Sequence, residues 1–144
     1  VQITSWSGNQ IHPVYSPTDT TIAFYANRDD PHRFDLYTMA ASGSGEAKQL
    51  ATGVVVDANG PAWTPDGKHL VVVLDDDDAF DPIAAINVGS GATKRLGLGT
   101  VGHGDLAVTN KDGQVWLAYV AQGKSSDAAR DFKRLFTALL DELP

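Results

Sequence analysis

The 144-residue chain is long enough for one domain with a buried core, and its 42% hydrophobic and 20% charged residues are typical of a soluble globular protein. Its net charge of −7 disfavours binding to the phosphate backbone of nucleic acid. The absence of cysteine excludes disulfides, thiol nucleophiles and zinc–cysteine sites, and no apolar run is long enough to span a membrane.

The first four residues, Val1-Gln2-Ile3-Thr4, alternate apolar and polar side chains as a half-buried strand does. We expect residues 1–5 to form an outer strand at the edge of a sheet. The chain starts with Val and not with Met, so we expect a processed, trimmed or partial form, in which any targeting segment could have been lost.

The segment from about residue 12 to residue 53 is predicted to form four strands. A short inner strand, Val14-Tyr15, ends at the turn Ser16-Pro17-Thr18-Asp19, in which Pro presets φ and Asp suits the turn. Further strands are predicted at residues 21–25, 34–39 and 47–50. The polar loop 27–31 and the Gly-containing turn 42–45 separate them.

A second unit, residues 54–100, repeats this order. Ala62-Trp63 and the turn Pro65-Asp66-Gly67 are followed by predicted strands at residues 69–74, 83–88 and 93–96. A third, shorter unit, residues 101–124, keeps apolar strands at 106–108 and 115–120. Corresponding residues lie roughly 46 to 48 positions apart, which is the period of a four-stranded propeller blade. Such units cannot bury their own sheet faces and must stack on neighbours.

From Asp127 onward the spacing of apolar residues changes to intervals of three and four, which is typical of a helix. This stripe consists of Phe132, Leu135, Phe136, Leu139, Leu140 and Leu143. Ser126 can cap the helix, and Asp127 suits its dipole. We therefore predict a C-terminal amphipathic α-helix over residues 125–144, in place of the outer strands of the third unit. Its stripe should pack on the last blade, or else form a ridge that binds a partner.

Three short motifs occur in the order found in the TolB-type propeller repeat, which typically reads aromatic-Ser-Pro-Asp-Gly-Lys, then Ser-Asn-Arg-Asp, then Asp-Leu-Tyr. Over about residues 1–120 the chain resembles this family, which implies an all-β fold, a β-propeller. The chain departs from the repeat at Thr18-Asp19, which replaces Asp-Gly, and at Asp81-Pro82-Ile83, which replaces Asp-Leu-Tyr, and the third unit lacks the aromatic. The matching segments are Tyr15-Ser16-Pro17-Thr18-Asp19, Trp63-Thr64-Pro65-Asp66-Gly67-Lys68, Ala26-Asn27-Arg28-Asp29 and Asp35-Leu36-Tyr37-Thr38-Met39.

The resemblance implies function less strongly than fold. TolB belongs to the Tol–Pal system of the bacterial envelope, so the resemblance implies a noncatalytic protein-interaction scaffold in the periplasm. Related repeats form gating propellers of prolyl-oligopeptidase-type peptidases, so the propeller portion of such a peptidase is one alternative. A ligand-binding propeller enzyme with a His/Asp site in its channel is another.

Three blades are too few to close a ring, because propellers usually have about four to eight. We therefore interpret the chain as half of a six-bladed ring and expect a homodimer, in which Val1–Thr4 of one chain complete the last blade of the other. Two alternatives stay open. The chain could be a piece of a longer six-bladed protein, or a monomer whose open face is covered by the terminal helix.

Five polar residues precede the inner strands and should line the mouth of the channel. His and Asp side chains are suitable donors to a metal ion or a polar ligand, although solvated loop residues are the simpler interpretation. These candidate ligand-binding residues are His12, Asp57, Asn59, His103 and Asp105.

Other motifs point less clearly to chemistry. Asp75-Asp76-Asp77-Asp78 with Asp81 could hold Ca²⁺, but the spacing differs from an EF-hand loop and favours a solvated loop. Residues 97–102 match the dinucleotide fingerprint by letter, yet a strand should follow them, so we interpret them as a loop between blades. No nucleophile elbow or Ser-His-Asp motif occurs, and we predict no enzymatic activity, no cofactor and no bound metal.

Overall fold

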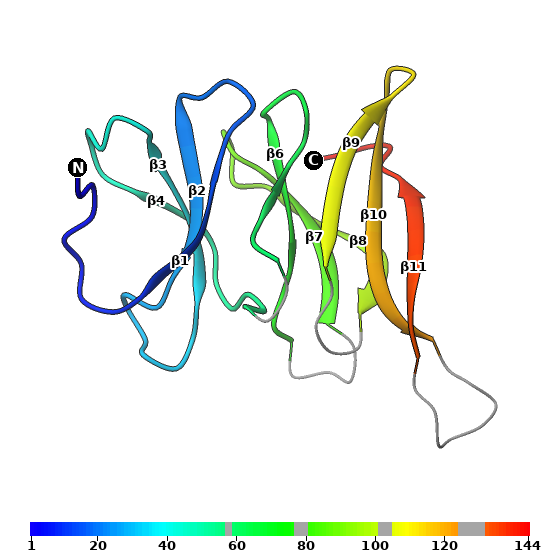
Figure 1. Ribbon diagram of the computed structural model, residues 1–144, viewed down its shortest axis with the longest axis horizontal. Helices are drawn as coiled ribbons and strands as arrows, with labels where there is room; N and C mark the ends of the chain where they lie inside the picture. Colours follow the sequence, from blue (N-terminus) through cyan, green and yellow to red (C-terminus); the bar gives the residue numbers. More distant parts are fainter. Residues whose placement is uncertain (57–58, 77–80, 101–104, 124–131) are drawn as a thin grey trace.

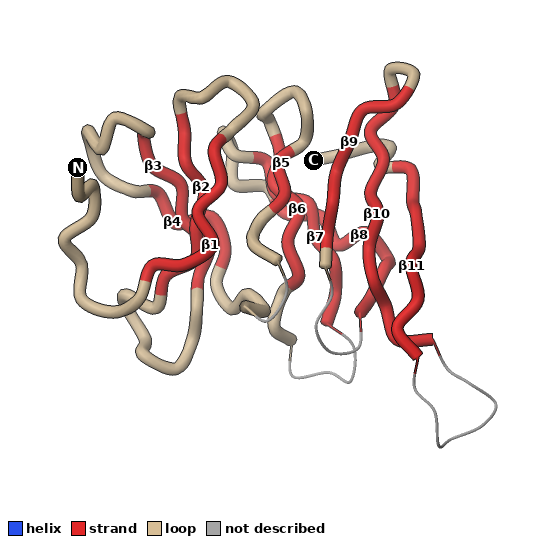
Figure 2. Tube along the Cα trace, viewed as in Figure 1, coloured by secondary structure: helices blue, strands red, loops and turns tan. Residues whose placement is uncertain are grey.

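The fold consists of strands and loops (Figure 2). The computed structural model describes residues 1–56, 59–76, 81–100, 105–123 and 132–144, and within them it contains no helix. A helix long and apolar enough to cross a membrane is accordingly absent from these residues. Three antiparallel sheets stand side by side in chain order (Figure 1), and each sheet is one blade of the predicted propeller.

Blade 1 has the strand order β1-β2-β3-β4. Its strands are β1 (Gln10–Tyr15), β2 (Thr21–Ala26), β3 (Asp35–Ala40) and β4 (Lys48–Ala51). The predicted turn joins β1 to β2, and in it the Asp19 N–H donates to the Ser16 carbonyl over 2.9 Å. Asp19 has a φ of 57°, a left-handed conformation that Asp tolerates, so it can replace the Gly of the repeat.

Blade 2 repeats this architecture in the order β5-β6-β7-β8. Its strands are β5 (Ala62–Trp63), β6 (His69–Val73), β7 (Asp81–Asn87) and β8 (Thr93–Thr100). Gly67, with a φ of 69°, occupies the turn position that Asp19 has in blade 1. The Thr64 hydroxyl donates to the Asp66 carboxylate over 2.6 Å and closes the turn.

Blade 3 corrects the prediction for the C-terminus. Its described strands are β9 (Leu106–Lys111), β10 (Gln114–Gly123) and β11 (Phe132–Leu139), in the order β11-β10-β9. The predicted helix over residues 125–144 is wrong, because residues 132–139 pair with β10 from Trp116↔Leu139 to Gly123↔Phe132, and residues 140–144 are not helical. A helix here would leave the backbone groups along one side of β10 unpaired, and their pairing outweighs the helical spacing.

Apolar clusters between the sheets hold the blades together. Both faces of β6 are buried: one faces blade 1 and the other faces blade 3. The cluster between blades 1 and 2 contains Ala23, Tyr25, Leu36, Leu50, Trp63, Leu70, Val72 and Ile86. The cluster between blades 2 and 3 contains Val71, Val73, Ile83, Leu106, Leu117 and Leu140. This stacking confirms that the repeat units bury one another's faces.

A lysine at an equivalent place in each fourth strand links each blade to the next. Lys48 of β4 donates to the carbonyls of Val88 and Gly89, just after β7, over 2.9 and 2.8 Å. Lys94 of β8 donates to the Glu142 carbonyl, after β11, over 2.7 Å. The repeat therefore determines contacts between blades as well as the strands within each blade.

The N-terminal segment forms no strand, although its alternation predicted one. Residues 1–9 lie along the outer side of blade 1 (Figure 1). There Ile3 and Trp6 pack on apolar residues of β2 and β3. The Trp6 ring centroid is 5.7 Å from that of Phe24 and 5.2 Å from that of Tyr37. The segment thus covers part of the sheet face that a preceding blade would cover.

Candidate functional site

His12 lies at an irregularity in β1. The register between β1 and β2 shifts between Ile11 and Val14, and His12 has a φ of 53°. This left-handed conformation is uncommon for a residue other than glycine and marks a strained position. The imidazole Nε2 lies 3.1 Å from the Val56 carbonyl oxygen, so His12 donates a hydrogen bond to the segment that precedes blade 2. The side chain therefore joins the ends of two neighbouring blades.

Gly60 explains how the two segments approach so closely. A Cβ at Gly60 would lie 2.6 Å from the His12 Cβ, so a larger residue fits only if the histidine moves. Asn59, the exposed neighbour of Gly60 in the chain, therefore lies at the same end of the molecule as His12. Asp105 is exposed just before β9, where its carbonyl accepts the Val120 N–H over 3.1 Å.

The other two predicted residues, Asp57 and His103, lie outside the described residues. In the part of the chain that the structure describes, no three His, Asp or Glu side chains form a group that could hold a metal ion. A ligand site at the channel mouth therefore stays a prediction, and its best-defined part is the contact between His12 and the strand-leading segment of blade 2.

The acidic loop is partly described. Asp76 forms an ion pair with Arg95 at 2.7 Å, and Asp77 and Asp78 lie outside the described residues. Burial, and then the negative charges of Asp75 and Asp76, raise the pKa of Asp81. A Ca²⁺ site in this loop also stays a prediction.

The residues that match the dinucleotide fingerprint lie partly in a strand. Residues 97–100 belong to β8 and not to the loop that we expected, because β8 continues to Thr100 and pairs there with Asp81. In a dinucleotide site these glycines would join a strand to a helix. The described part of the motif is itself a strand, and this placement supports the interpretation that it is not a nucleotide site.

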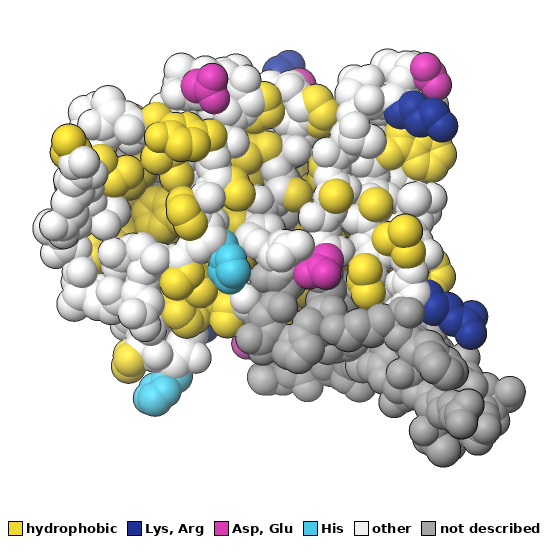
Figure 3. All heavy atoms as spheres, in the orientation of Figure 1, with side chains coloured by type: hydrophobic (Ala, Val, Ile, Leu, Met, Phe, Trp, Pro, Cys, Tyr) yellow, Lys and Arg dark blue, Asp and Glu magenta, His cyan; other side chains and the backbone are white. Residues whose placement is uncertain are grey.

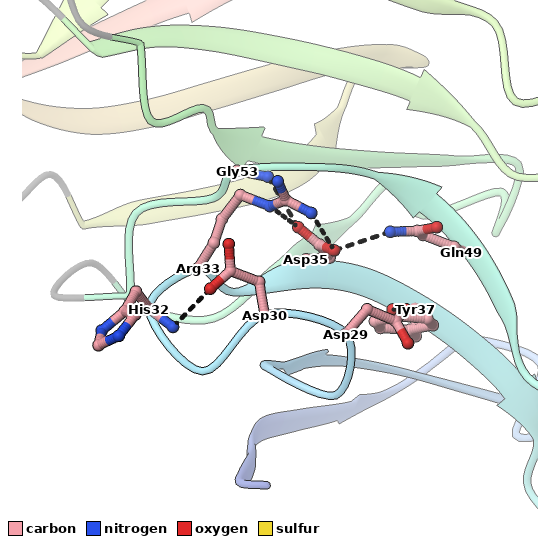
Figure 4. Close-up of polar contacts among 8 residues, drawn as sticks. All are labelled: Asp29, Asp30, His32, Arg33, Asp35, Tyr37, Gln49 and Gly53. Carbon is pink, nitrogen blue, oxygen red and sulfur yellow. Dashed lines mark hydrogen bonds and ion pairs between the residues drawn. The ribbon is translucent and has the colours of Figure 1, made fainter.

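The sequence analysis did not predict that Asp35 forms a buried hydrogen-bond network. This residue is only 1% exposed. Its carboxylate accepts hydrogen bonds from Arg33 Nε and Nη2 at 2.9 and 3.3 Å (Figure 4). It also accepts from Gln49 Nε2 at 2.8 Å and from the Gly53 N–H at 3.0 Å. The Asp-Leu-Tyr motif identified the residue, but its partners come from other segments. The network fixes the start of β3 to β4 and the loop that follows.

The Asn-Arg-Asp motif is also explained by packing. The Arg28 guanidinium lies 4.6 Å from the centroid of the Trp6 ring and 5.5 Å from that of Tyr37. Asp29 accepts from Arg28 Nε at 2.9 Å and from the Tyr37 hydroxyl at 2.8 Å, and these bonds lower the pKa of Asp29. Burial, followed by the bond to Asp29, raises the pKa of Tyr37 to about 12. These groups hold the N-terminal segment on blade 1.

Both outer sides of the blade stack expose apolar residues. Trp63 is 9% exposed between blades 1 and 2, whereas Tyr15, its equivalent in blade 1, is 62% exposed, and no described blade covers it. On the far side of blade 3, Leu135 is 74% exposed and Leu139 is 36% exposed. Figure 3 shows hydrophobic side chains at the surface at both ends of the stack. A groove of about 290 Å³ crosses the far side of blade 3 and is lined by Ala107, Thr109, Trp116, Ala118 and Thr137, among others.

No family profile and no curated protein sequence matches the chain. Among solved structures, TolB from Acinetobacter baumannii matches with a TM-score of 0.65 and 14% identity, over 92% of this chain and 31% of that chain. A structure named for TolB from Agrobacterium tumefaciens matches with a TM-score of 0.60 and 19% identity, over 84% of this chain and 40% of that chain.

A third match comes from a peptidase. The β-propeller domain of the Trilobed protease from Pyrococcus furiosus has a TM-score of 0.63 and 10% identity, over 94% of this chain and 44% of that chain. The chain thus spans less than half the length of each of these three structures. At such low identities the matches carry the fold alone, and they agree with the repeat motifs and the three stacked sheets. The chain has the fold of a TolB-type β-propeller, built from three repeat units.

Proposed function

We propose that the chain is a noncatalytic propeller module that acts by binding other polypeptides. The observation that carries this proposal is the exposure of apolar side chains on both outer sides of the blade stack. Tyr15 is exposed on blade 1, and Leu135 and Leu139 are exposed on blade 3. Leu135 and Leu139 lie on one face of β11, and apolar side chains gathered on one face commonly mark a contact surface.

A second copy of this chain can cover the outer side of blade 1 and the outer side of blade 3 at the same time. In such a dimer, blade 3 of one copy precedes blade 1 of the other. Tyr15 then packs on the inner strand of the neighbouring blade, as Trp63 packs on β1 within this chain, where its ring N–H donates to the Val14 carbonyl over 3.3 Å. Two copies give a ring of about six blades, a common size for propellers, and a twofold axis relates the two interfaces.

The assembled ring would present His12, Asn59 and Asp105 at one end of its channel. We propose that a protein partner binds at this end, and that the location is periplasmic. The similarity to TolB structures supports the location, and the exposure of these side chains supports the binding surface. Channel-mouth loops suit this role because the blades hold them rigidly while their side chains stay free to vary.

A second candidate function is that of a propeller attached to a peptidase, where it controls access to a catalytic domain outside this chain. The similarity to the propeller domain of the Trilobed protease favours it. The two functions differ in what covers the open sides of the stack. A gating propeller would use further blades of its own protein, whereas the proposed scaffold uses a second copy of the same chain.

The solution mass tests the proposal. We expect light scattering on a sizing column to give a mass that rises from 15.3 kDa towards twice that value with concentration. Leu135→Asp places a charge on the open side of blade 3, and Tyr15→Asp does the same on blade 1. Each should weaken the dimer by about tenfold or more, because a charge in an apolar contact costs more than about 1.4 kcal/mol. Thr20→Asp, in an exposed turn, should leave the mass unchanged.

Three results would contradict the proposed two-copy ring. A wild-type chain that stays at 15.3 kDa over the whole concentration range would remove the two-copy assembly. A dimer that survives both Leu135→Asp and Tyr15→Asp would place its contact elsewhere. If only Leu135→Asp weakens the dimer, two copies meet through blade 3 alone and do not close a ring.

A further inference from the structure

The fourth strand of blade 1 makes a specific contact with blade 2. Leu50 of β4 lies in one apolar cluster with Leu70 of β6 and Ile86 of β7. Leu70 and Ile86 are directly opposite each other in the pairing of β6 with β7. A fourth strand in this propeller therefore places a large apolar side chain against the second and third strands of the blade that follows.

Ile3 makes the same contact with blade 1. Ile22 of β2 and Met39 of β3 are directly opposite each other, and they occupy the positions that Leu70 and Ile86 have in blade 2. Ile3 packs on the cluster that contains both. The N-terminal segment thus stands to blade 1 as a fourth strand stands to the next blade, although it belongs to no sheet in the described residues.

Blade 3 has the complementary deficiency, since its described sheet has three strands where blades 1 and 2 have four. The backbone of β11 shows which groups are free. The Leu140 N–H donates to the Val115 carbonyl over 2.8 Å, and alternation along the ladder assigns Ala138 and Phe136 to bonding with β10. The N–H and C=O groups of Leu135, Thr137 and Leu139 therefore point away from β10, and no described strand pairs with them.

We propose that the N-terminal segment of one copy, Val1–Trp6, adds to β11 of a second copy as the fourth strand of its blade 3. The proposal rests on the two-copy assembly proposed above. Ile3 would keep its present place on its own blade 1, while the backbone of the segment pairs with the neighbouring copy. Six extended residues span about 20 Å, which is most of the length of the eight-residue β11.

The packing of the segment fits this role. Cavities of about 450 and 250 Å³ lie between it and blade 1, and Ile3 and Thr4 line both. The segment is thus held on blade 1 chiefly by Ile3 and Trp6 and leaves space around its backbone. Two copies related by a twofold axis would exchange their segments reciprocally, so that each open edge is paired and neither remains exposed.

Thr137→Pro tests the proposal in the full-length chain. Thr137 is exposed, and Pro removes the N–H that points to the open edge without removing a bond to β10. Thr137→Val keeps this N–H and is the matched control. We expect Thr137→Pro to weaken the dimer at least tenfold relative to Thr137→Val, with the circular dichroism spectrum of the monomer unchanged. Equal dimerisation of the two variants would overturn strand addition and leave the two-copy ring intact.

A peptide assay separates the two proposals if the wild-type chain is monomeric. The probe is a fluorescent peptide with the sequence of residues 1–7, and a scrambled peptide is the control. We expect the probe to bind the Thr137→Val chain at least tenfold more tightly than the Thr137→Pro chain. Such binding to a monomeric protein would support strand addition and remove the ring. No binding, or equal binding to both variants, would overturn strand addition.

Discussion

Two aspartates, each the first residue of the third strand of its blade, have opposite electrostatic surroundings. Asp35 begins β3, and its carboxylate accepts four hydrogen bonds, two of them from Arg33. Asp81 begins β7, where burial and the charges of Asp75 and Asp76 raise its pKa. We therefore predict that the same substitution, Asp→Asn, destabilises the fold at Asp35 and stabilises it at Asp81 at neutral pH.

The magnitude at Asp35 follows from its contacts. An Asn amide has one acceptor oxygen, and its NH₂ group would face the donors of Arg33 or Gln49. Breaking a buried ion pair costs about 3–5 kcal/mol, and this figure must be reduced because the Arg33 side chain is 45% exposed. We expect a loss of about 2–4 kcal/mol, which for a chain of this size lowers Tm by roughly 6–12 °C.

The sign at Asp81 follows from linkage. The pKa of Asp81 is raised in the folded state, so protonation of Asp81 stabilises the fold. This stabilisation is fully present below the unfolded pKa of about 4. It is lost as pH rises through the folded pKa. Asp81→Asn should therefore unfold at a higher temperature than wild type at pH 7, and this advantage should disappear below about pH 4.

Thermal unfolding, followed by circular dichroism at pH 7 and below about pH 4, measures the Tm of Asp35→Asn and of Asp81→Asn. The wild-type chain is the reference, and each variant serves as the control for the other. If Asp35→Asn unfolds within about 1 °C of wild type, the network around Asp35 contributes no net stability and our reasoning is refuted. If both variants lower Tm equally at pH 7, the substitution itself, and not the electrostatics, determines the result.

Three further predictions concern contacts between segments. Lys48→Met removes two hydrogen bonds between blades and should lower the free energy of unfolding by about 1 kcal/mol in a denaturant titration, whereas Lys68→Met, in an exposed turn, should change it by less than about 0.5 kcal/mol. Gly60→Ala forces the neighbouring histidine to move, which should cost about 1–3 kcal/mol and shift its imidazole resonances in an NMR spectrum; unchanged resonances would contradict the close approach. Tyr37→Phe removes a bond that lowers the pKa of Asp29, so the stability that this bond adds is present above about pH 4 and lost as pH falls through the folded pKa. The difference between wild type and Tyr37→Phe should accordingly shrink in unfolding measurements at low pH, and a constant difference would count against the linkage.

The strands of blades 1 and 2 were predictable because short turns fix where they start. Pro65, Asp66 and Gly67 each favour one conformation of the turn, and the structure places β6 directly after it. The end of β8 was not predictable, because Gly97 and Gly99 suggested a loop. Gly99 pairs with Pro82 of β7, which extends the strand despite the low preference of glycine for it. Gly97 lies at the register shift of this ladder, where its φ of 67° suits glycine.

The prediction of a C-terminal helix was wrong because the spacing of apolar residues in this segment fits both a helix and a strand. Leu135 and Leu139 are four residues apart, which suits one face of a helix, and both also lie on one face of a strand. Phe136 decides against the helix in the structure, since it lies on the opposite face and stacks on Tyr119 with ring centroids 5.4 Å apart. That partner lies in a different strand, and spacing within the segment does not reveal it.

The candidate site shows the same limit. The sequence placed His12 and Asn59 ahead of inner strands, and the structure brings them to one end of the molecule. The positive φ of His12 and the close approach of Gly60 depend on how two blades meet, so neither could be read from one repeat. The equivalence of Lys48 and Lys94 was visible in the sequence, because each lysine precedes a leucine by two residues in the fourth strand of its blade.

The lysine contacts have a consequence for the order in which the chain folds during synthesis. The acceptors of Lys48 are the carbonyls of Val88 and Gly89, and the inner face of blade 1 is covered by Trp63 and Leu70. A nascent chain that has released only blade 1 from the ribosome lacks all of these partners. Each blade should therefore fold only after the next blade has been synthesised. Blade 1 should become resistant to protease only after β7 has emerged from the ribosome.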